Sequence, residues 1–173
     1  TNPADGTTIA EYARHDDGEV EARLARSWTR FTHDWRTRPL EDRTDLLERL
    51  ADVLDDRTDE LARLMTAEMG KPIRAARIEV EKCAWLCRHY AETAETYLAG
   101  RSIETDAAKS YVRYDPMGPI LAVMPWNFPL WQVFRFLVPN VVGGNTCLLR
   151  HASNVTGTAL EIERMVAEAG GPD

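Results

Sequence analysis

The chain has 173 residues, of which 44% are hydrophobic and 28% are charged, a balance that is typical of one folded globular domain and excludes a disordered or collagen-like chain. A formal net charge of -7, with no cluster of basic residues, excludes the electrostatic signature of a nucleic-acid-binding protein. The three cysteines are an odd number, and the N-terminus shows no secretory signal, so we expect free thiols and a cytoplasmic location.

Residues 1–16 predict an extended segment, and residues 17–100 predict helices, because apolar residues recur there three and four positions apart. Four helices fit this stretch, with Gly70 and Gly100 ending the third and the fourth. Acidic or hydroxyl N-caps and prolines at first helical positions indicate where each begins. The expected starts are Asp17 and Thr58, both as N-caps, and Pro39 and Pro72.

Beyond Gly100 the pattern changes to strands alternating with helices. Residues 111–114 alternate like a strand with one exposed face, whereas residues 120–124 are continuously apolar, like a strand buried on both faces. The remaining expected elements are a turn at residues 125–129, a helix at 129–142, a strand at 146–149 and a helix at 155–169.

This order predicts an α/β protein in which an N-terminal helical segment precedes the first β-α-β-α units of a parallel sheet. Two strands buried on both faces need further neighbours, so we expect an incomplete sheet and a chain that is the first part of a larger protein. The longest apolar stretch, residues 119–142, does not predict a membrane span. It is interrupted by three prolines and by Asn127, Gln132, Arg135 and Asn140.

Several short motifs in a fixed order form the most specific pattern of the chain. They are Pro125-Trp126-Asn127-Phe128-Pro129 after an apolar strand, Gly143-Gly144-Asn145 before a strand that ends at Arg150, and a final Glu168-Ala169-Gly170-Gly171-Pro172. Together with Glu68-Met69-Gly70-Lys71-Pro72 and Glu79-Val80-Glu81, this pattern resembles the aldehyde dehydrogenase superfamily over essentially the whole chain. The resemblance implies the N-terminal, cofactor-domain portion of an enzyme that oxidises an aldehyde with NAD or NADP.

The resemblance also gives a domain division and a partner. It implies an extended segment at residues 1–16, the helical part of the cofactor-binding domain at 17–100, an oligomerisation hairpin at 101–118 and the first half of a Rossmann-like NAD(P)-binding sheet at 119–173. A homo-oligomer is therefore expected. The family's nucleophilic cysteine and its glycine turn for the pyrophosphate both belong to parts beyond this chain, so we expect the isolated chain to be inactive.

Asn127 is the candidate catalytic residue. When a thiolate attacks an aldehyde, the carbonyl oxygen becomes negative, and a fixed amide donor can stabilise it by roughly 3 to 4 kcal/mol. The resemblance implies that Asn127 is this donor. The alternative is that its side chain only satisfies backbone groups in a turn between two prolines.

The candidate cofactor-binding residues are Met124, Pro125, Trp126, Arg150 and Ser153, all by resemblance. Family members usually have a lysine where this chain has Arg150, and many NAD-preferring members have a glutamate where it has Ser153. Serine neither repels nor crowds a 2'-phosphate, so NADP would be admitted as well as NAD. The alternative is a surface arginine beside a serine that caps a helix.

Arg135 is the candidate for substrate choice, because it is the only charged residue between Asp115 and Arg150 and a buried, unpaired cation would be costly. It lies eight residues after Asn127, about 12 Å along a helix. Succinate-semialdehyde dehydrogenases, a group within this family, resemble the chain here and hold the substrate carboxylate with an arginine. Phe128, Trp131 and Arg135 are therefore the expected substrate-binding residues. The alternative is an arginine bonded to carbonyls or to a partner acid.

No metal site is expected. Cys83 and Cys87 are one helical turn apart, but no histidine has matching ligand spacing, so two packed thiols are the better interpretation. A different class of function stays open: a non-catalytic fragment that binds a nucleotide or a partner through its incomplete sheet.

Overall fold

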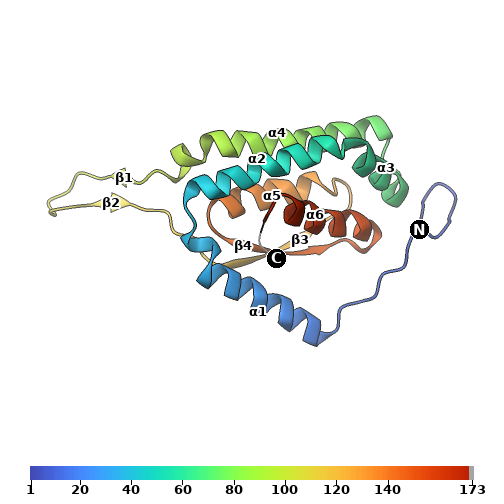
Figure 1. Cartoon of the computed structure of the whole chain (residues 1–173), viewed down its shortest axis with the longest axis horizontal. Helices are drawn as coiled ribbons and strands as arrows, with labels where there is room; N and C mark the ends of the chain where they lie inside the picture. Colours follow the sequence, from blue (N-terminus) through green and yellow to red (C-terminus); the bar gives the residue numbers. More distant parts are fainter. Residues whose placement is uncertain (172–173) are drawn as a thin grey trace.

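The computed structural model describes residues 1–171 and has six α-helices and two small two-stranded sheets among them (Figure 1). Pro172, in the last of the sequence motifs, lies outside the described residues. The helices are α1 (Asp17–His33), α2 (Leu40–Asp56), α3 (Thr58–Met69), α4 (Ile73–Leu98), α5 (Trp131–Val142) and α6 (Thr156–Glu168), with 3-10 turns η1 (Trp35–Thr37) and η2 (Ser153–Val155). The strands are β1 (Arg101–Ser102), β2 (Tyr111–Val112), β3 (Pro119–Met124) and β4 (Thr146–His151).

The helix starts differ from the sequence prediction in their caps. Asp16, not Asp17, is the N-cap of α1, and it exchanges hydrogen bonds with Glu19 in a capping box. Thr58 does not cap α3, because it is already helical and its hydroxyl donates to the carbonyl of Leu54 at 3.0 Å. Gly70 ends α3 as predicted, in the left-handed conformation that glycine adopts without strain.

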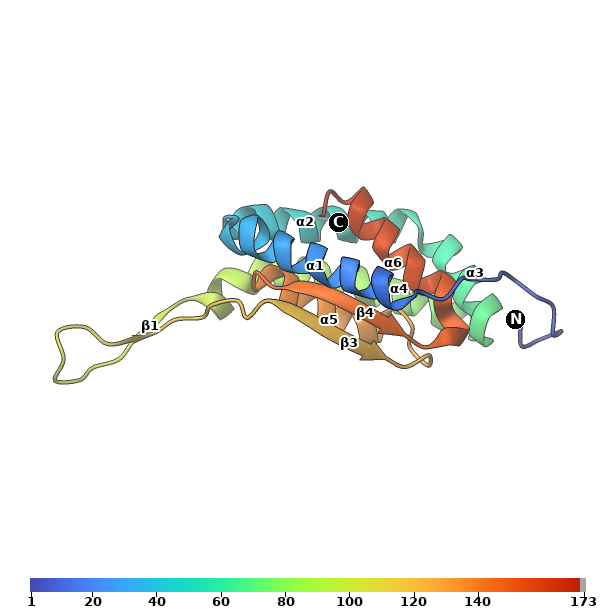
Figure 2. The ribbon, with the colours of Figure 1, turned by 90° about the horizontal axis from the view of Figure 1, so that it is seen from below.

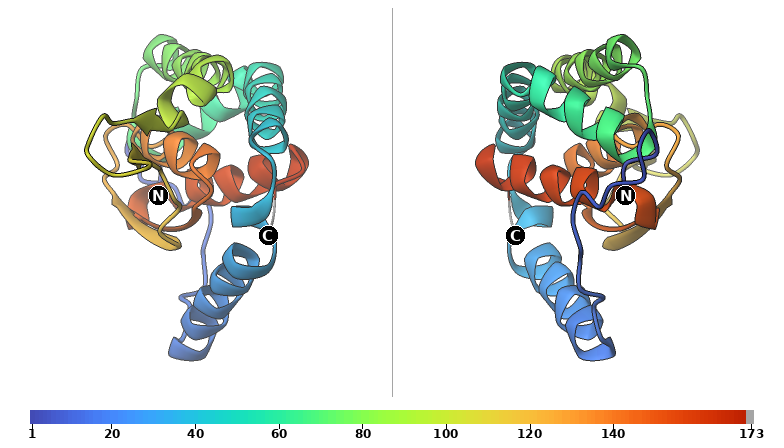
Figure 3. Two further views of the ribbon diagram at one scale, coloured as in Figure 1. Left: turned by 90° about the vertical axis from the view of Figure 1, so that its left-hand side faces the viewer. Right: turned by 90° about the vertical axis from the view of Figure 1, so that its right-hand side faces the viewer.

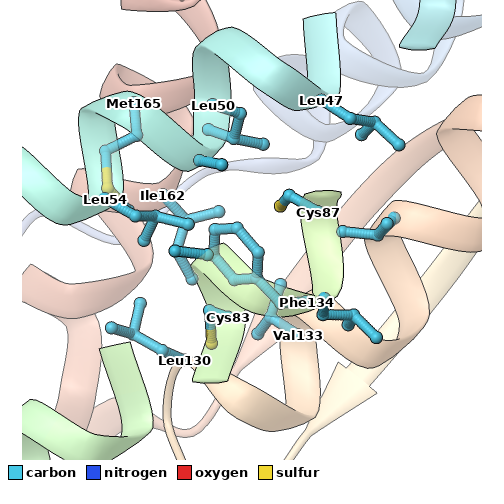
Figure 4. Packing of buried hydrophobic residues seen from close by; sticks show 14 of the residues in the cluster. Leu47, Leu50, Leu54, Cys83, Cys87, Leu130, Val133, Phe134, Ile162 and Met165 are labelled. Atoms are coloured by element: carbon cyan, nitrogen blue, oxygen red, sulfur yellow. The ribbon is translucent and has the colours of Figure 1, made fainter. Parts of the chain in front are cut away.

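One continuous hydrophobic core lies between the helical layer α2, α3 and α4 and the pair α5 and α6. Phe134 of α5 is fully buried within it, and Figure 4 shows side chains of α2, α4 and α6 around its ring. Cys83 and Cys87 point into the same core, as the interpretation of packed thiols predicted. This packing fixes α5, and with it the turn that precedes α5.

The second sheet is parallel, with Met124 at the end of β3 paired with His151 at the end of β4. Only one face of β3 is covered: Ala122 is buried, whereas Leu121 and Val123 are each 61% exposed. The prediction of a strand buried on both faces is therefore wrong for this chain. Its continuous apolar pattern is typical of a strand that is covered on both faces, which makes the exposed face of β3 a candidate surface for contact with further protein.

The elements follow one another from α2 and α4 on one side of the molecule, through α5, α6 and the parallel sheet, to α1 on the other side (Figures 1 and 3). The antiparallel pair β1 and β2 forms a hairpin that projects away from this body, at the end opposite the N-terminal segment (Figure 2). The strand predicted at residues 111–114 is shorter, because Arg113 and Tyr114 lie outside β2. No helix among residues 1–171 is long and apolar enough to cross a membrane.

Candidate active site

The predicted functional residues gather at the edge where β3 and β4 both end. Because the two strands are parallel, the turn after Met124 and the segment after His151 leave the sheet at the same edge. The first leads through Asn127 into α5, and the second leads through Ser153 into α6. Open α/β sheets bind their ligands at this edge.

The turn between β3 and α5 is held by side chains from α4, from the segment before α4 and from β4. Glu79 accepts the backbone N–H groups of Leu130 and Trp131, both at 2.9 Å, and so caps α5. Lys71 forms an ion pair with Glu79 and donates to the carbonyl of Asn127 at 3.3 Å. These contacts fix the backbone of the turn on both sides of Phe128.

His151 holds the same turn from β4. Its Nδ1 accepts the N–H of Ala152 at 2.8 Å, so Nε2 carries the proton and donates to the carbonyl of Pro129 at 2.9 Å. Burial lowers the pKa of His151, and the hydrogen bond to Pro129 offsets this only in part. The imidazole is therefore held in its neutral form, with both nitrogens used.

The side chain of Asn127 is exposed and makes no hydrogen bond to any residue between 1 and 171. The alternative in which its amide satisfies the backbone of its own turn thus has no hydrogen bond to support it. A held backbone with an unused amide is the arrangement that a preorganised donor for a ligand oxygen requires.

The predicted substrate residues lie along the start of α5 but differ in their surroundings. Phe128 is 45% exposed, with the ammonium of Lys71 4.0 Å from its ring centroid. Lys82 lies over the ring of Trp131 at 3.8 Å. The premise that Arg135 is buried is wrong: it is exposed, because its side of α5 faces away from the core. Among the described residues it has no ion pair or hydrogen bond, which leaves the guanidinium available to a ligand.

The predicted cofactor residues form an open wall. Trp126 is 50% exposed, Pro125, Arg150 and Ser153 are exposed, and Met124 is partly buried. A cavity of about 60 Å³ lies beside Ser153, between the N-terminal segment and Glu68. Typical small-molecule sites measure roughly 300 Å³ or more, so this cavity is too small to enclose a dinucleotide.

Sequence reasoning gave no role to two buried glutamates that cap the helices behind this edge. Glu68 accepts the N–H groups of Gly157 at 2.6 Å and Thr158 at 3.0 Å, and so holds the start of α6 as Glu79 holds α5. Because a carboxylate already occupies the N-terminus of α5 and that of α6, neither helix end is open to a phosphate. The signal was present: both glutamates interrupt the apolar faces of α3 and α4.

None of the three thiols has the lowered pKa that is typical of a nucleophilic cysteine. Burial raises the pKa of Cys83 and Cys87 and raises that of Cys147 to about 12, so each stays a thiol at neutral pH. Among residues 1–171 there is no group of three or more histidine, cysteine or acidic side chains that could hold a metal ion.

The fold and this edge define one class of protein. The profile described as "Aldehyde dehydrogenase family" matches residues 1–173, and the chain belongs to that family. This confirms the resemblance on which the site residues were chosen.

Similar proteins carry more specific names. A probable succinate-semialdehyde dehydrogenase (NADP+) from Synechocystis is 49% identical over 99% of this chain, and succinate-semialdehyde dehydrogenase (NADP+) 1 from Mycobacterium tuberculosis is 45% identical over 99%. The chain spans only 38% of the length of each.

Solved structures give the same fold. The succinic semialdehyde dehydrogenase of Streptococcus pyogenes, in complex with NADP+, has a TM-score of 0.90 at 35% identity, covering 94% of this chain and 36% of that one. An aldehyde dehydrogenase from Brucella melitensis biovar abortus has a TM-score of 0.94 at 29% identity, covering 99% and 36%. The α/β prediction with an incomplete sheet is confirmed.

Proposed function

We propose that this chain is the N-terminal part of an enzyme that oxidises succinate semialdehyde to succinate with NADP or NAD. The observation that carries the proposal is the exposed, unpartnered amide of Asn127 on a turn held by Lys71, Glu79 and His151. A fixed amide of this kind stabilises the oxygen that becomes negative when a thiolate attacks an aldehyde. The names of the relatives supply the substrate class.

The residues of this chain fit the adenosine end of a dinucleotide, whose nicotinamide accepts a hydride when it is bound. Arg150 presents an exposed guanidinium at the end of β4, and Ser153 presents a small hydroxyl on η2. Neither has an acidic partner among the described residues. A phosphate on the 2' position of the ribose would thus meet the positive charge of Arg150 and the hydroxyl of Ser153, which favours NADP.

The site also has a place for a carboxylate on the substrate. Arg135 is exposed one helical turn after Trp131, and it has no competing acid among the described residues. Asn127 and Arg135 would then bind the two ends of a short chain, with an aldehyde at one end and a carboxylate at the other.

Two features support contact with further protein. The exposed face of β3 is apolar, and the hairpin of β1 and β2 stands clear of the body (Figure 2) with the Tyr111 side chain exposed. We propose that the hairpin takes part in a homo-oligomer of the complete enzyme. Sedimentation of the complete enzyme with and without residues 103–110 tests this, and an unchanged mass would contradict it.

The complete enzyme that contains this chain tests the function. We expect NADPH formation from succinate semialdehyde, with lower efficiency for NAD. Ser153→Glu places a like charge against the 2'-phosphate and should shift the preference toward NAD by about tenfold or more. Asn154→Gln is the matched control, since it changes a neighbouring exposed side chain without adding charge.

One result would count against the role of Ser153, and another would count against the function itself. If the ratio of the efficiencies with NADP and NAD is the same in the parent and in Ser153→Glu, Ser153 does not belong to the cofactor site. A complete enzyme that oxidises no aldehyde but binds a nucleotide would favour the non-catalytic alternative.

A further inference from the structure

A buried ion pair lies directly beneath the turn that carries Asn127. Glu79 is 4% exposed and Lys71 is 8% exposed, and the ammonium of Lys71 contacts one oxygen of the Glu79 carboxylate. Taking both charges out of water costs several kcal/mol per ion, which their attraction offsets only in good geometry. Such a pair is therefore a poor device for stability alone, and its remaining contacts indicate what else it does.

The two oxygens of the Glu79 carboxylate contact different groups. Its Oε2 contacts Lys71, and its Oε1 accepts the N–H groups of Leu130 and Trp131 at 2.9 Å each. A negative charge at this position also suits the positive end of α5. Glu79 therefore fixes the point at which the turn becomes a helix.

Lys71 contacts the other side of the turn, before α5. It donates to the carbonyl of Asn127 at 3.3 Å, and its ammonium lies 4.0 Å from the ring centroid of Phe128. The ammonium of Lys71 thus acts on the backbone of Asn127, and the carboxylate of Glu79 acts on the backbone of Leu130 and Trp131. Neither group contacts the side-chain amide of Asn127.

We propose that Lys71 and Glu79 are positioning residues for the reaction, and that they hold the backbone of Asn127 so that its side-chain amide meets the substrate oxygen. This inference rests on the proposed function. An oxyanion donor must be held within roughly 0.5 Å of its working position, and a displacement of about 1 Å costs on the order of 100-fold in rate. The pair acts on the rate of the chemical step, and it does not contact the substrate.

The test uses the complete enzyme with three changes: Lys71→Met, Glu79→Gln and the double variant. Each single change leaves one charge buried without its partner, so both should lower Tm. The double variant removes both charges and should recover much of that Tm. Its kcat should stay about 10- to 100-fold below the parent, because no donor reaches the carbonyl of Asn127. KM for the aldehyde should change less than about threefold, since no substrate contact is lost.

A matched control is Glu161→Gln, which breaks another largely buried pair, with Arg57 at 2.5 Å, on α6. It should lower Tm with kcat unchanged. Hydrogen exchange of the segment 127–131 supplies a second readout: protection should fall in Glu79→Gln and stay at the parent level in Glu161→Gln, because only the first loses a charged acceptor for the amides of Leu130 and Trp131.

The outcomes are distinguishable. If kcat of the double variant recovers together with Tm, or if either single variant keeps the parent kcat, the pair is only structural and the inference is overturned. If the complete parent enzyme oxidises no aldehyde, the proposed function fails and the positioning role fails with it. Parent activity with a low kcat and a restored Tm in the double variant would support both.

Discussion

At the scale of single residues, the site combines a turn whose backbone is fixed by hydrogen bonds with exposed side chains that make none. Asn127 and Arg135 are both exposed, and neither side chain has a partner among residues 1–171. Exposed polar residues without partners are ordinary on a protein surface, so exposure by itself proves nothing. What separates Asn127 from a surface asparagine is that buried, charged side chains fix the turn beneath it. Arg135 has no such support, and its role therefore depends on what it binds.

Replacing Arg135 by leucine in the complete enzyme tests that role. If the guanidinium binds the distal carboxylate, Arg135→Leu should lower kcat/KM for succinate semialdehyde by about 10- to 100-fold, since one charge-assisted hydrogen-bonded pair is lost. Neutral aldehydes of similar length make no such contact and should stay within a few-fold of the parent. Steady-state kinetics on both substrate classes measure the difference.

Arg63→Leu is the matched control, because Arg63 is an exposed arginine on α3, away from the turn. It should leave both substrate classes unchanged. An equal loss on both classes in Arg135→Leu would make Arg135 a structural residue, and no loss on either would remove this face of α5 from the proposed substrate site.

At the scale of elements, the turn between β3 and α5 depends on β4 through His151. The neutral imidazole uses both nitrogens, and protonation of Nδ1 would set a second N–H against that of Ala152. Because burial lowers the pKa of His151 in the folded chain, the unfolded state binds more protons as the pH falls below its usual value of about 6.5. The stability that His151 contributes is thus complete above that value and is lost as the pH falls through the lowered pKa.

This gives a prediction for the pH dependence of stability. Urea unfolding of the chain between pH 7.5 and pH 5, in steps of roughly 0.5 units, should show a free energy of unfolding that falls toward acid. In His151→Gln the fall should be smaller, because the titrating group is gone. His33→Gln removes an exposed histidine and serves as the comparison. Equal slopes in all three proteins would contradict the assignment.

The sequence predicted the helices well, but it predicted poorly which side chains cap and hold them. Helical periodicity located all four N-terminal helices, because their apolar faces repeat over many residues. The N-cap of α1 was predicted one residue too late, since Asp16 and Asp17 are equally good cap residues and only the backbone conformation decides between them. Glu68 and Glu79 stand out in the sequence as acids on apolar helix faces, but the helix that each one caps could not be predicted, because it lies far along the chain and only the tertiary structure brings it near.

At the scale of the whole molecule, the sequence showed that the sheet is incomplete, and the structure showed where. The apolar run at β3 predicted a strand covered on both faces, whereas Leu121 and Val123 are exposed. The apolar pattern of β3 fits a strand that is covered on both faces, whereas residues 1–171 cover only one of them. The same holds for the site, where four exposed side chains have no hydrogen-bond or ion-pair partner among the described residues: Asn127, Arg135, Arg150 and Ser153. Both observations agree with a chain that spans 38% of its relatives.

This incompleteness gives the last prediction, that the purified 173-residue chain forms no NADH or NADPH from succinate semialdehyde or any other aldehyde. Covalent oxidation needs a thiolate, and burial keeps Cys83, Cys87 and Cys147 protonated, with the pKa of Cys147 raised to about 12. A thiol reagent at pH 8 should therefore label the native chain slowly and all three cysteines rapidly in urea. Absorbance at the nicotinamide wavelength measures the first result, and the time course of labelling measures the second. Fast labelling of a native thiol would show that a cysteine is exposed after all, and cofactor reduction by the wild-type chain that disappears in Cys147→Ser would place the nucleophile within this chain.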